Sequence, residues 1–299
     1  MKSRLIYWLT YASMWLLALL PFKVLYILSD GLCFLMHHVV HYRRRVVRAN
    51  LCNAFPEKSA AELRDIEREF YRYICDYMLE EVKMLRMSFK ELCRRMEYDN
   101  KEEYLAMIEK HGGIVLLIPH YANFEWITGM SSIMQEGDIP VQIYKPLHNK
   151  YMDVMFKRIR TRFGGYNVAK HSTAREIIKL CRDNKRVAVG MITDQSPNPN
   201  EAHYWTTFLN QDTVFMDGAE RIAKLMDFPV FYCELQKQGR GYCRVRFDLI
   251  TETPKATADG EITECFARRL EQTIRREPPY WFWSHKRWKL KREDTIQHG

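Results

Sequence analysis

The chain has 299 residues, of which 47% are hydrophobic and 28% charged, and a formal net charge of +9 at pH 7. This composition excludes an intrinsically disordered chain, because it supplies enough apolar surface for one sizeable core. The positive charge favours anionic partners, and nucleic acid, anionic lipid and an acidic protein all qualify. The eight cysteines include no C-x-x-C pair. Structural zinc is therefore not expected. Because no cleavable-looking signal peptide precedes the cysteines, we expect them to be reduced thiols in a cytoplasmic domain.

The N-terminus is predicted to associate with a membrane. Residues 5–20 carry no charge, and residues 24–40 form a second apolar stretch. The first stretch is a little shorter than the roughly 20 residues of a straight transmembrane span. A single span is our favoured prediction, while a re-entrant hairpin and an interfacial helix stay open. Tyr7, Trp8 and Trp15 belong to the residue types that gather at the bilayer interface.

A basic cluster, Arg43-Arg44-Arg45 with Arg48, follows the apolar stretches. Such a cluster beside a membrane segment favours the cytoplasmic side, where it meets anionic headgroups. A solvated basic face has the same composition. We therefore predict an N-terminal membrane segment, residues 1–42, followed by a cytoplasmic domain, residues 43–299.

Three helix starts are predicted next. They lie at Ser59, Ser88 and Asn100, each of which has a glutamate three positions later, the pattern of a capping box. Gly112-Gly113 is expected to end the third helix.

Beyond Gly113, short apolar runs alternate with helix-length amphipathic stretches. The runs cover residues 114–118, 141–144, 187–192, 230–235 and 245–249, and helices are expected near residues 125–135, 151–163, 172–181, 217–226 and 261–276. This alternation predicts an α/β fold with a central, mostly parallel sheet flanked by helices.

Candidate catalytic residues lie where the first run ends. The run leads into Pro119-His120, and Glu125 follows five positions later. Active sites of such sheets gather at the carboxyl ends of strands, so the two side chains are expected to share a cavity. His120 is predicted to act as the general base toward an acceptor hydroxyl, with Glu125 orienting the imidazole. The spacing of His120 and Glu125 is by itself weak evidence for catalysis, because a lone histidine more often completes a hydrogen bond in the core.

Aromatic and basic residues alternate in the C-terminal stretch, residues 278–289. This pattern is compatible with stacking on single-stranded nucleic acid, with a membrane interface and with a clamp for an anionic substrate. The apolar N-terminus and the lack of a recognised nucleic-acid module argue against nucleic acid as a partner.

Three blocks, in order, resemble the lipid A biosynthesis acyltransferase family, the late lauroyl and myristoyl transferases of bacterial outer-membrane lipid synthesis. They are residues 48–57 (RANLCNAFPE), residues 113–126 with the motif H-x4-E, and residues 283–289 (WSHKRWK). The resemblance covers nearly the whole chain. It implies a glycerolipid-acyltransferase-like α/β fold with an N-terminal membrane helix, His120 and Glu125 as the catalytic residues, and neither a metal nor a cofactor.

The resemblance also implies a set of substrate-binding residues. They are Asn123, Arg160, Asp194, His285, Arg287 and Lys289. Asp194 independently fits this role because it follows the run at residues 187–192, although an aspartate before Ser196-Pro197 is also typical of a turn. Arg160 equally fits a solvated helix face, and the three C-terminal residues equally fit an interfacial anchor.

The implied partners are an acyl carrier protein thioester as donor, a phosphorylated glucosamine disaccharide lipid as acceptor, and membrane lipid. The implied location is the inner membrane, with the catalytic domain on the cytoplasmic side. Both substrates are anionic, which agrees with the basic chain.

One block departs from the family, whose usual Phe-Phe-Gly appears here as Thr207-Phe208-Leu209-Asn210. Acyl-chain length and acceptor therefore stay open. An amino-acid-containing lipid or another glycolipid is an alternative acceptor, and an inactive membrane scaffold of the same fold is an alternative function.

Overall fold

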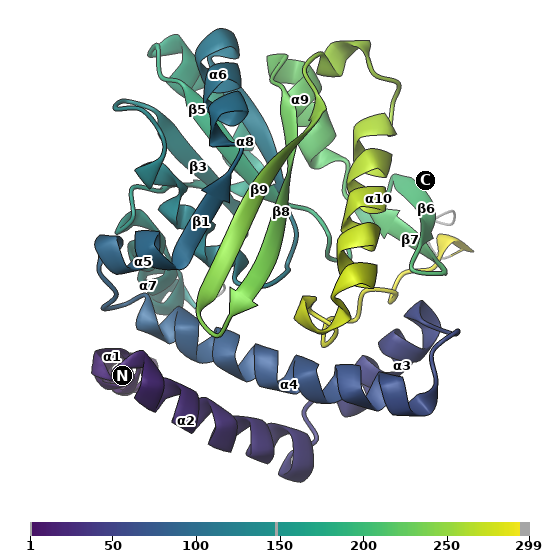
Figure 1. Cartoon of the computed structure of the whole chain (residues 1–299). Helices are drawn as coiled ribbons and strands as arrows, with labels where there is room; N and C mark the ends of the chain where they lie inside the picture. The colour runs from purple at the N-terminus through teal and green to yellow at the C-terminus, as the bar shows by residue number, and fades with distance from the viewer. Residues whose placement is uncertain (1, 147–148, 294–299) are drawn as a thin grey trace.

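The computed structural model describes residues 2–146 and 149–293 and has a seven-stranded sheet at its centre (Figure 1). The strand order is β1-β9-β8-β2-β5-β3-β4, and every pairing is parallel except β8 with β9. The strands are β1 (Met96–Asp99), β2 (Gly113–Ile118), β3 (Ile139–Tyr144), β4 (Tyr166–Ala169), β5 (Val187–Ile192), β8 (Val230–Gly239) and β9 (Tyr242–Thr251). The predicted mostly parallel α/β sheet is confirmed.

The central strand β2 shows why the sheet is covered on both faces. All six of its residues are buried, as expected for a parallel strand between two helical layers. Each of the five predicted apolar runs falls in a strand. The sequence missed β1 and β4, which lie at the two edges of the sheet and have only four residues each.

Helices make up most of the remaining chain. They are α1 (Lys2–Leu19), α2 (Phe22–Phe34), α3 (Arg44–Ala54), α4 (Ala60–Lys83), α5 (Phe89–Arg95), α6 (Lys101–His111), α7 (Lys150–Thr161), α8 (Thr173–Arg182), α9 (Gly218–Met226) and α10 (Glu261–Arg276), with a π-helical turn η1 (Leu35–Val39) and 3-10 helices η2 (Phe124–Ser132), η3 (Lys170–Ser172), η4 (Pro199–Glu201), η5 (Pro254–Ala256) and η6 (Pro278–Tyr280). The helix predicted near residues 125–135 is thus the 3-10 helix η2.

Two of the three predicted helix caps hold. Ser59 and Glu62 form a complete capping box at the start of α4, and the Ser88 side chain accepts from the backbone N–H of Glu91. Asn100 is different, because its φ of 45° turns the chain and its side chain makes no cap hydrogen bond. Its Oδ1 instead accepts from the backbone N–H of Phe247 at 3.0 Å, so Asn100 ties α6 to β9.

The departing block at residues 207–210 forms a hairpin turn. It joins β6 (Tyr204–Phe208) to β7 (Gln211–Phe215), a separate two-stranded sheet. Leu209 and Asn210, the two residues of the turn, have φ of 49° and 61°. Asparagine tolerates this left-handed conformation better than most residues, so Asn210 suits the second position of this turn.

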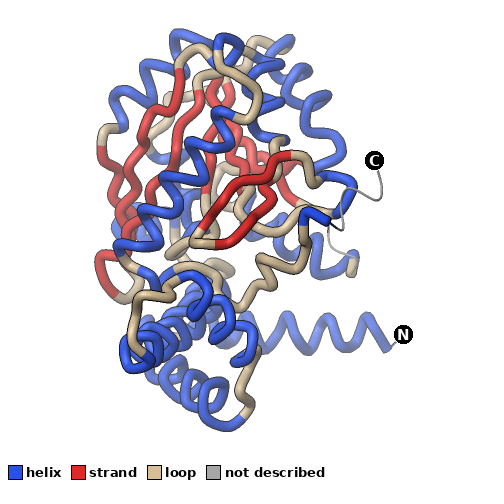
Figure 2. Tube along the Cα trace, turned by 90° about the vertical axis from the view of Figure 1, so that its right-hand side faces the viewer, coloured by secondary structure: helices blue, strands red, loops and turns tan. Residues whose placement is uncertain are grey.

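The long helix α4 separates the N-terminal helices from the sheet (Figure 1). Figure 2 shows α1 projecting to one side of the molecule, with its N-terminal end farthest out. Within the described residues, the stretch Phe22–Val39 is long and apolar enough to cross a membrane, judged by length and composition alone.

Candidate active site

The site begins where two neighbouring parallel strands end together. Ile118 of β2 lies opposite Ile192 of β5 in the sheet register. The chain therefore leaves both strands at the same level, and His120 and Asp194, each two residues further on, lie side by side. This is the carboxyl edge at which α/β sheets place their ligands.

His120 is held by Asp194. Its Nδ1 lies 2.6 Å from Asp194 Oδ1, and its backbone N–H donates to Asp194 Oδ2 at 3.0 Å. Trp281 Nε1 donates to the same Oδ2 at 2.8 Å. The Asp194 side chain is 1% exposed, and three donors converge on it, which is the environment of an ionised carboxylate.

The charge state of Asp194 fixes the protonation of the imidazole. Burial alone would raise the pKa of this carboxyl, but its charge interaction with His120 and the hydrogen bonds from His120 and Trp281 outweigh burial and lower the pKa. An ionised carboxylate can only accept, so Nδ1 carries the hydrogen. Nε2, on the far side of the ring, is left as the acceptor that a general base needs.

The loop after His120 is locked in an uncommon backbone conformation. Ala122 has a φ of 47°, rare for a residue with a side chain. Tyr73 Oη donates to the carbonyl of Ala122 at 2.7 Å, and the N–H of Ala122 donates to the carbonyl of Tyr280 at 2.9 Å. The loop is thus fixed from α4 on one side and from the C-terminal segment on the other.

Glu125 lines the same cavity as His120, as predicted, but it does not orient the imidazole. Its carboxylate is bound by Arg160 of α7, whose Nε donates to Oε2 at 2.9 Å while Nη2 donates to Oε1. The turn at Ala122 redirects the chain between His120 and Glu125, and Asp194 takes the place beside the imidazole. Arg160, predicted to bind substrate, is here the partner of Glu125, and both side chains line the same cavity as His120.

Asn123 is buried beneath the motif. It is 3% exposed, and its Nδ2 donates to Glu80 Oε2 of α4 at 2.7 Å. Glu80 Oε1 accepts from Tyr26 Oη of α2 at 3.0 Å. The geometry therefore gives Asn123 a supporting role for the loop instead of the predicted contact with substrate.

A cavity of about 640 Å³ opens in front of His120. Apolar side chains form one part of its wall: Phe124, Ile143, Phe156, Met191, Ile192 and Met216. Charged side chains form another, with five cations (Lys145, Lys157, Arg160, Lys170 and Arg221) and four carboxylates (Glu125, Asp153, Glu201 and Asp217). Three of the cations are paired, Lys157 with Asp153, Arg160 with Glu125 and Lys170 with Glu201. Such a wall suits a molecule with a long apolar part and a polar, charged part.

The three C-terminal residues predicted to bind substrate have different surroundings. His285 Nε2 accepts from the backbone N–H of Ser196 at 3.1 Å, and burial together with the charge of Arg287 lowers the pKa of His285 to about 4. The neutral ring thus supports the loop after Asp194. Arg287 is 1% exposed, with Nη2 donating to the carbonyl of Val214 at 2.6 Å, so its guanidinium is buried inside the fold. Lys289 alone is exposed, in a separate groove between α3 and the C-terminal segment.

Sequence reasoning missed two supporting residues of the site. Trp281 donates to Asp194, yet it read as one of several aromatics in a basic segment. Glu80 supports Asn123, and nothing in the sequence pattern singled it out. In residues 2–146 and 149–293, no group of three or more His, Cys, Asp or Glu side chains is arranged to hold a metal ion.

Comparison with known proteins gives one consistent answer. A family model described as bacterial lipid A biosynthesis acyltransferase matches residues 1–290. The lipid A biosynthesis lauroyltransferase of Escherichia coli (strain K12) is 22% identical over 295 residues, which cover 96% of this chain and 93% of that protein. The lipid A biosynthesis acyltransferase of Haemophilus influenzae is 22% identical over 220 residues, covering 73% and 67%. The palmitoleoyltransferase of lipid A biosynthesis from E. coli is 19% identical over 289 residues, covering 95% and 92%.

Proposed function

Because the chain belongs to the bacterial lipid A biosynthesis acyltransferase family, we propose that it moves a fatty acyl chain from acyl carrier protein to a hydroxyl of a lipid A precursor. The observation that carries this proposal is the His120–Asp194 pair at the wall of a cavity that is apolar on one part and charged on another. This arrangement places a base beside a space for a lipid with a long apolar chain and a polar head.

In the proposed reaction, His120 Nε2 takes the proton from the acceptor hydroxyl as its oxygen attacks the thioester carbonyl. The tetrahedral intermediate collapses by breaking the carbon–sulfur bond, and the imidazolium returns its proton to the leaving thiolate. Asp194 holds the ring in the reactive tautomer and stabilises its transient positive charge. The acyl group passes directly to the acceptor, with no acyl-enzyme.

Arg160 is proposed to stabilise the negative charge that develops on the carbonyl oxygen. Its Nε and Nη2 are committed to Glu125, which fixes the planar guanidinium in the cavity wall. A positioned cation is more effective than a mobile one because it needs no reorganisation during the reaction. Glu125 thereby orients Arg160, in place of the role toward His120 expected from the sequence.

The substrate assignment rests on the cavity and on charge. The apolar wall suits the acyl chain, while the cations suit phosphate groups of a lipid A precursor or of the carrier's prosthetic arm. The net charge of +9 favours approach of an acidic carrier protein. We place the enzyme at the inner membrane with its catalytic domain on the cytoplasmic side, where both substrates are expected. The chain length transferred and the hydroxyl acylated are not assigned.

The test is acyl transfer by the purified full chain in detergent, from acyl carrier protein to a tetra-acylated lipid A precursor, followed by mass spectrometry. His120→Ala is expected to lower kcat by roughly 10²- to 10⁴-fold, the contribution usual for general base catalysis. His171→Ala, an exposed histidine outside the cavity, is the matched control and should keep the wild-type rate. A wild-type rate in His120→Ala would rule out His120 as the base. Transfer only to an amino-acid-containing lipid or another glycolipid would reassign the acceptor.

A further inference from the structure

We infer that α1 and α2 lie flat in one leaflet of an anionic bilayer, as an in-plane lipid-binding surface, and that the chain does not cross the membrane. This inference concerns how the protein meets its lipid and rests on the proposed membrane acceptor. It differs from the single span that composition favoured. It follows from the packing of the two helices, because one side of each already contacts the rest of the protein.

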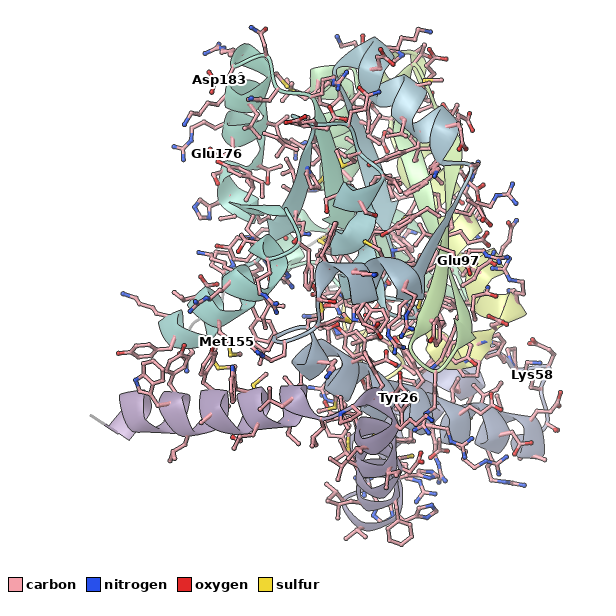
Figure 3. All side chains as sticks on the ribbon, turned by 60° about the vertical axis from the view of Figure 1, so that its left-hand side comes forward. Tyr26, Lys58, Glu97, Met155, Glu176 and Asp183 are labelled. Atoms are coloured by element: carbon pink, nitrogen blue, oxygen red, sulfur yellow. The ribbon has the colours of Figure 1, made fainter. Side chains whose placement is uncertain are left out.

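One side of α2 is bound to α4 by polar side chains. Ser29 Oγ donates to Asp76 Oδ1 at 2.6 Å, and Ser29 is fully buried. Tyr26 Oη donates to Glu80, as described above. Figure 3 shows Tyr26 close to where α1 and α2 meet, directly beneath the sheet domain. A helix joined in this way along its length to a charged helix cannot leave it to enter a bilayer alone.

Crossing would also carry an ion-pair network into hydrocarbon. Asp30, inside the candidate stretch Phe22–Val39, pairs with Arg240 at 2.7 Å, and Arg240 also pairs with Asp76 at 2.7 Å. Charged side chains in the centre of a bilayer are costly. At the membrane surface the same network keeps its contact with water, so the in-plane orientation avoids that cost.

α1 is likewise occupied on one side. Tyr7, Tyr11, Met14 and Ala18 recur at steps of three and four residues and pack toward the rest of the protein. The Tyr7 ring stacks on Tyr151 of α7 at 5.1 Å, and Lys83 Nζ donates to the carbonyls of Ala18 and Leu20 at 2.8 and 2.7 Å. Figure 3 shows α1 running beneath Met155 of α7.

The opposite sides of both helices are apolar and open. On α1 the exposed residues include Trp8, Leu9, Leu16 and Leu19, and on α2 and η1 they include Ile27, Leu28, Phe34 and Val39. Leu16 is 60% exposed and Ile27 70% exposed. Exposed apolar patches of this extent mark interaction surfaces. The exposed cations Arg43 and Arg45 follow directly, and a basic rim beside an apolar face is the chemistry of an anionic bilayer surface.

The surface continues toward the active site through α7. Tyr151, which stacks on α1, is followed on the same helix by Val154, which is 60% exposed. Asp153, Phe156 and Lys157 of this helix line the catalytic cavity. A lipid held in the leaflet therefore meets the cavity wall without leaving the membrane surface.

Binding is tested by flotation of the full chain with vesicles of phosphatidylethanolamine and phosphatidylglycerol. Leu16→Glu and Ile27→Glu are each expected to lower the partition coefficient by at least about tenfold, because each removes a large apolar side chain from the lipid. Leu225→Glu is the matched control, since Leu225 is 56% exposed on α9, at the opposite end of the molecule (Figure 1). An equal fall of the partition coefficient in Leu225→Glu, or no fall in the Leu16→Glu/Ile27→Glu double variant, would contradict the proposed lipid-binding surface.

Orientation is tested on the same vesicles with a membrane-impermeant maleimide, reading the labelled peptides by mass spectrometry. Cysteines are introduced at the N-terminus and by Lys23→Cys, in the first turn of α2, just after its junction with α1. Both are expected to label from the outside at similar rates. Protection of both cysteines would indicate a span through Phe22–Val39, protection of the N-terminal cysteine alone a span through α1, and protection at position 23 alone a hairpin of two spans. Each of these results overturns the in-plane orientation.

The outcome is separable from that of the proposed function. Ile27→Glu is expected to retain its rate on substrate dispersed in detergent while losing rate on vesicles. A chain with no acyl transfer in detergent but normal vesicle binding would refute the proposed function and leave the lipid surface intact.

Discussion

Replacing Asp194 by asparagine changes one atom but is expected to reverse the imidazole tautomer. Two donors, the backbone N–H of His120 and the indole N–H of Trp281, converge on Oδ2. An asparagine at this position keeps them only if its oxygen takes the Oδ2 site, which directs its NH₂ toward His120 Nδ1. Nδ1 must then accept, so the hydrogen moves to Nε2 and the base loses its lone pair.

The expected loss follows from this tautomer. An imidazole that presents N–H to the acceptor hydroxyl cannot remove its proton, and the carboxylate that stabilised the imidazolium is gone as well. We expect kcat to fall by roughly 10³- to 10⁴-fold, with little change in KM, because Asp194 does not line the cavity. Glu125→Gln, which keeps part of the contact with Arg160, is expected to cost less than Asp194→Asn.

The assay is single-turnover acyl transfer in detergent, with circular dichroism and thermal unfolding to verify the fold. Asp212→Asn is the matched control, because Asp212 is half-exposed and paired with Arg292 away from the cavity. If Asp194→Asn stays within about tenfold of wild type while Glu125→Gln abolishes turnover, Glu125 is the functional partner of His120, and the tautomer argument is wrong.

Three smaller changes test the surroundings of the site. Trp281→Phe removes one hydrogen bond to Asp194 and is expected to lower kcat by about tenfold, a loss of about 1–2 kcal/mol, in the same assay. Asn123→Ala removes the donor to Oε2 of the buried Glu80, whose Oε1 keeps Tyr26, and is expected to cost about 1–3 kcal/mol in the free energy of unfolding by urea. Burial and the charge of Glu125 raise the pKa of Glu81 well above its ordinary value, so the native state binds a proton that the unfolded chain releases at neutral pH. Glu81→Gln should therefore raise Tm at pH 7–8, with an advantage that disappears as the pH falls below the unfolded-state pKa of Glu81.

The sequence was sufficient for the five inner strands of the sheet and for the position of His120. Periodicity located the five long strands, and the end of the run at residues 114–118 located His120 at a carboxyl edge. Asp194 was placed at a second strand end by the same reasoning. The hydrophobic pattern does not give the order of the strands, and only the pairing of β2 with β5 brings His120 and Asp194 together at their ends. That pairing joins segments about 70 residues apart and depends on packing of the whole sheet.

The contact predicted between Glu125 and His120 failed for a local reason. Glu125 lies five positions after His120, and the prediction assumed that the turn between them brings the carboxylate to the imidazole. The left-handed conformation of Ala122 directs the chain elsewhere, and no residue type in the sequence marks it. It is held by hydrogen bonds from Tyr73 and to Tyr280, one from α4 and one near the C-terminus. Distant partners of this kind cannot be read from local spacing.

The helix α4 connects the two parts of the proposed function. Its residues Tyr73, Asp76 and Glu80, spaced three and four apart, project along one side and hold both the motif loop and α2. The helix α2 and the loop after His120 thus share one rigid support in α4. A buried network that holds two elements in this way fixes their separation. If α2 lies in the leaflet surface, the height of His120 above the lipid is set by the fold, and with it the depth from which an acceptor hydroxyl is reached.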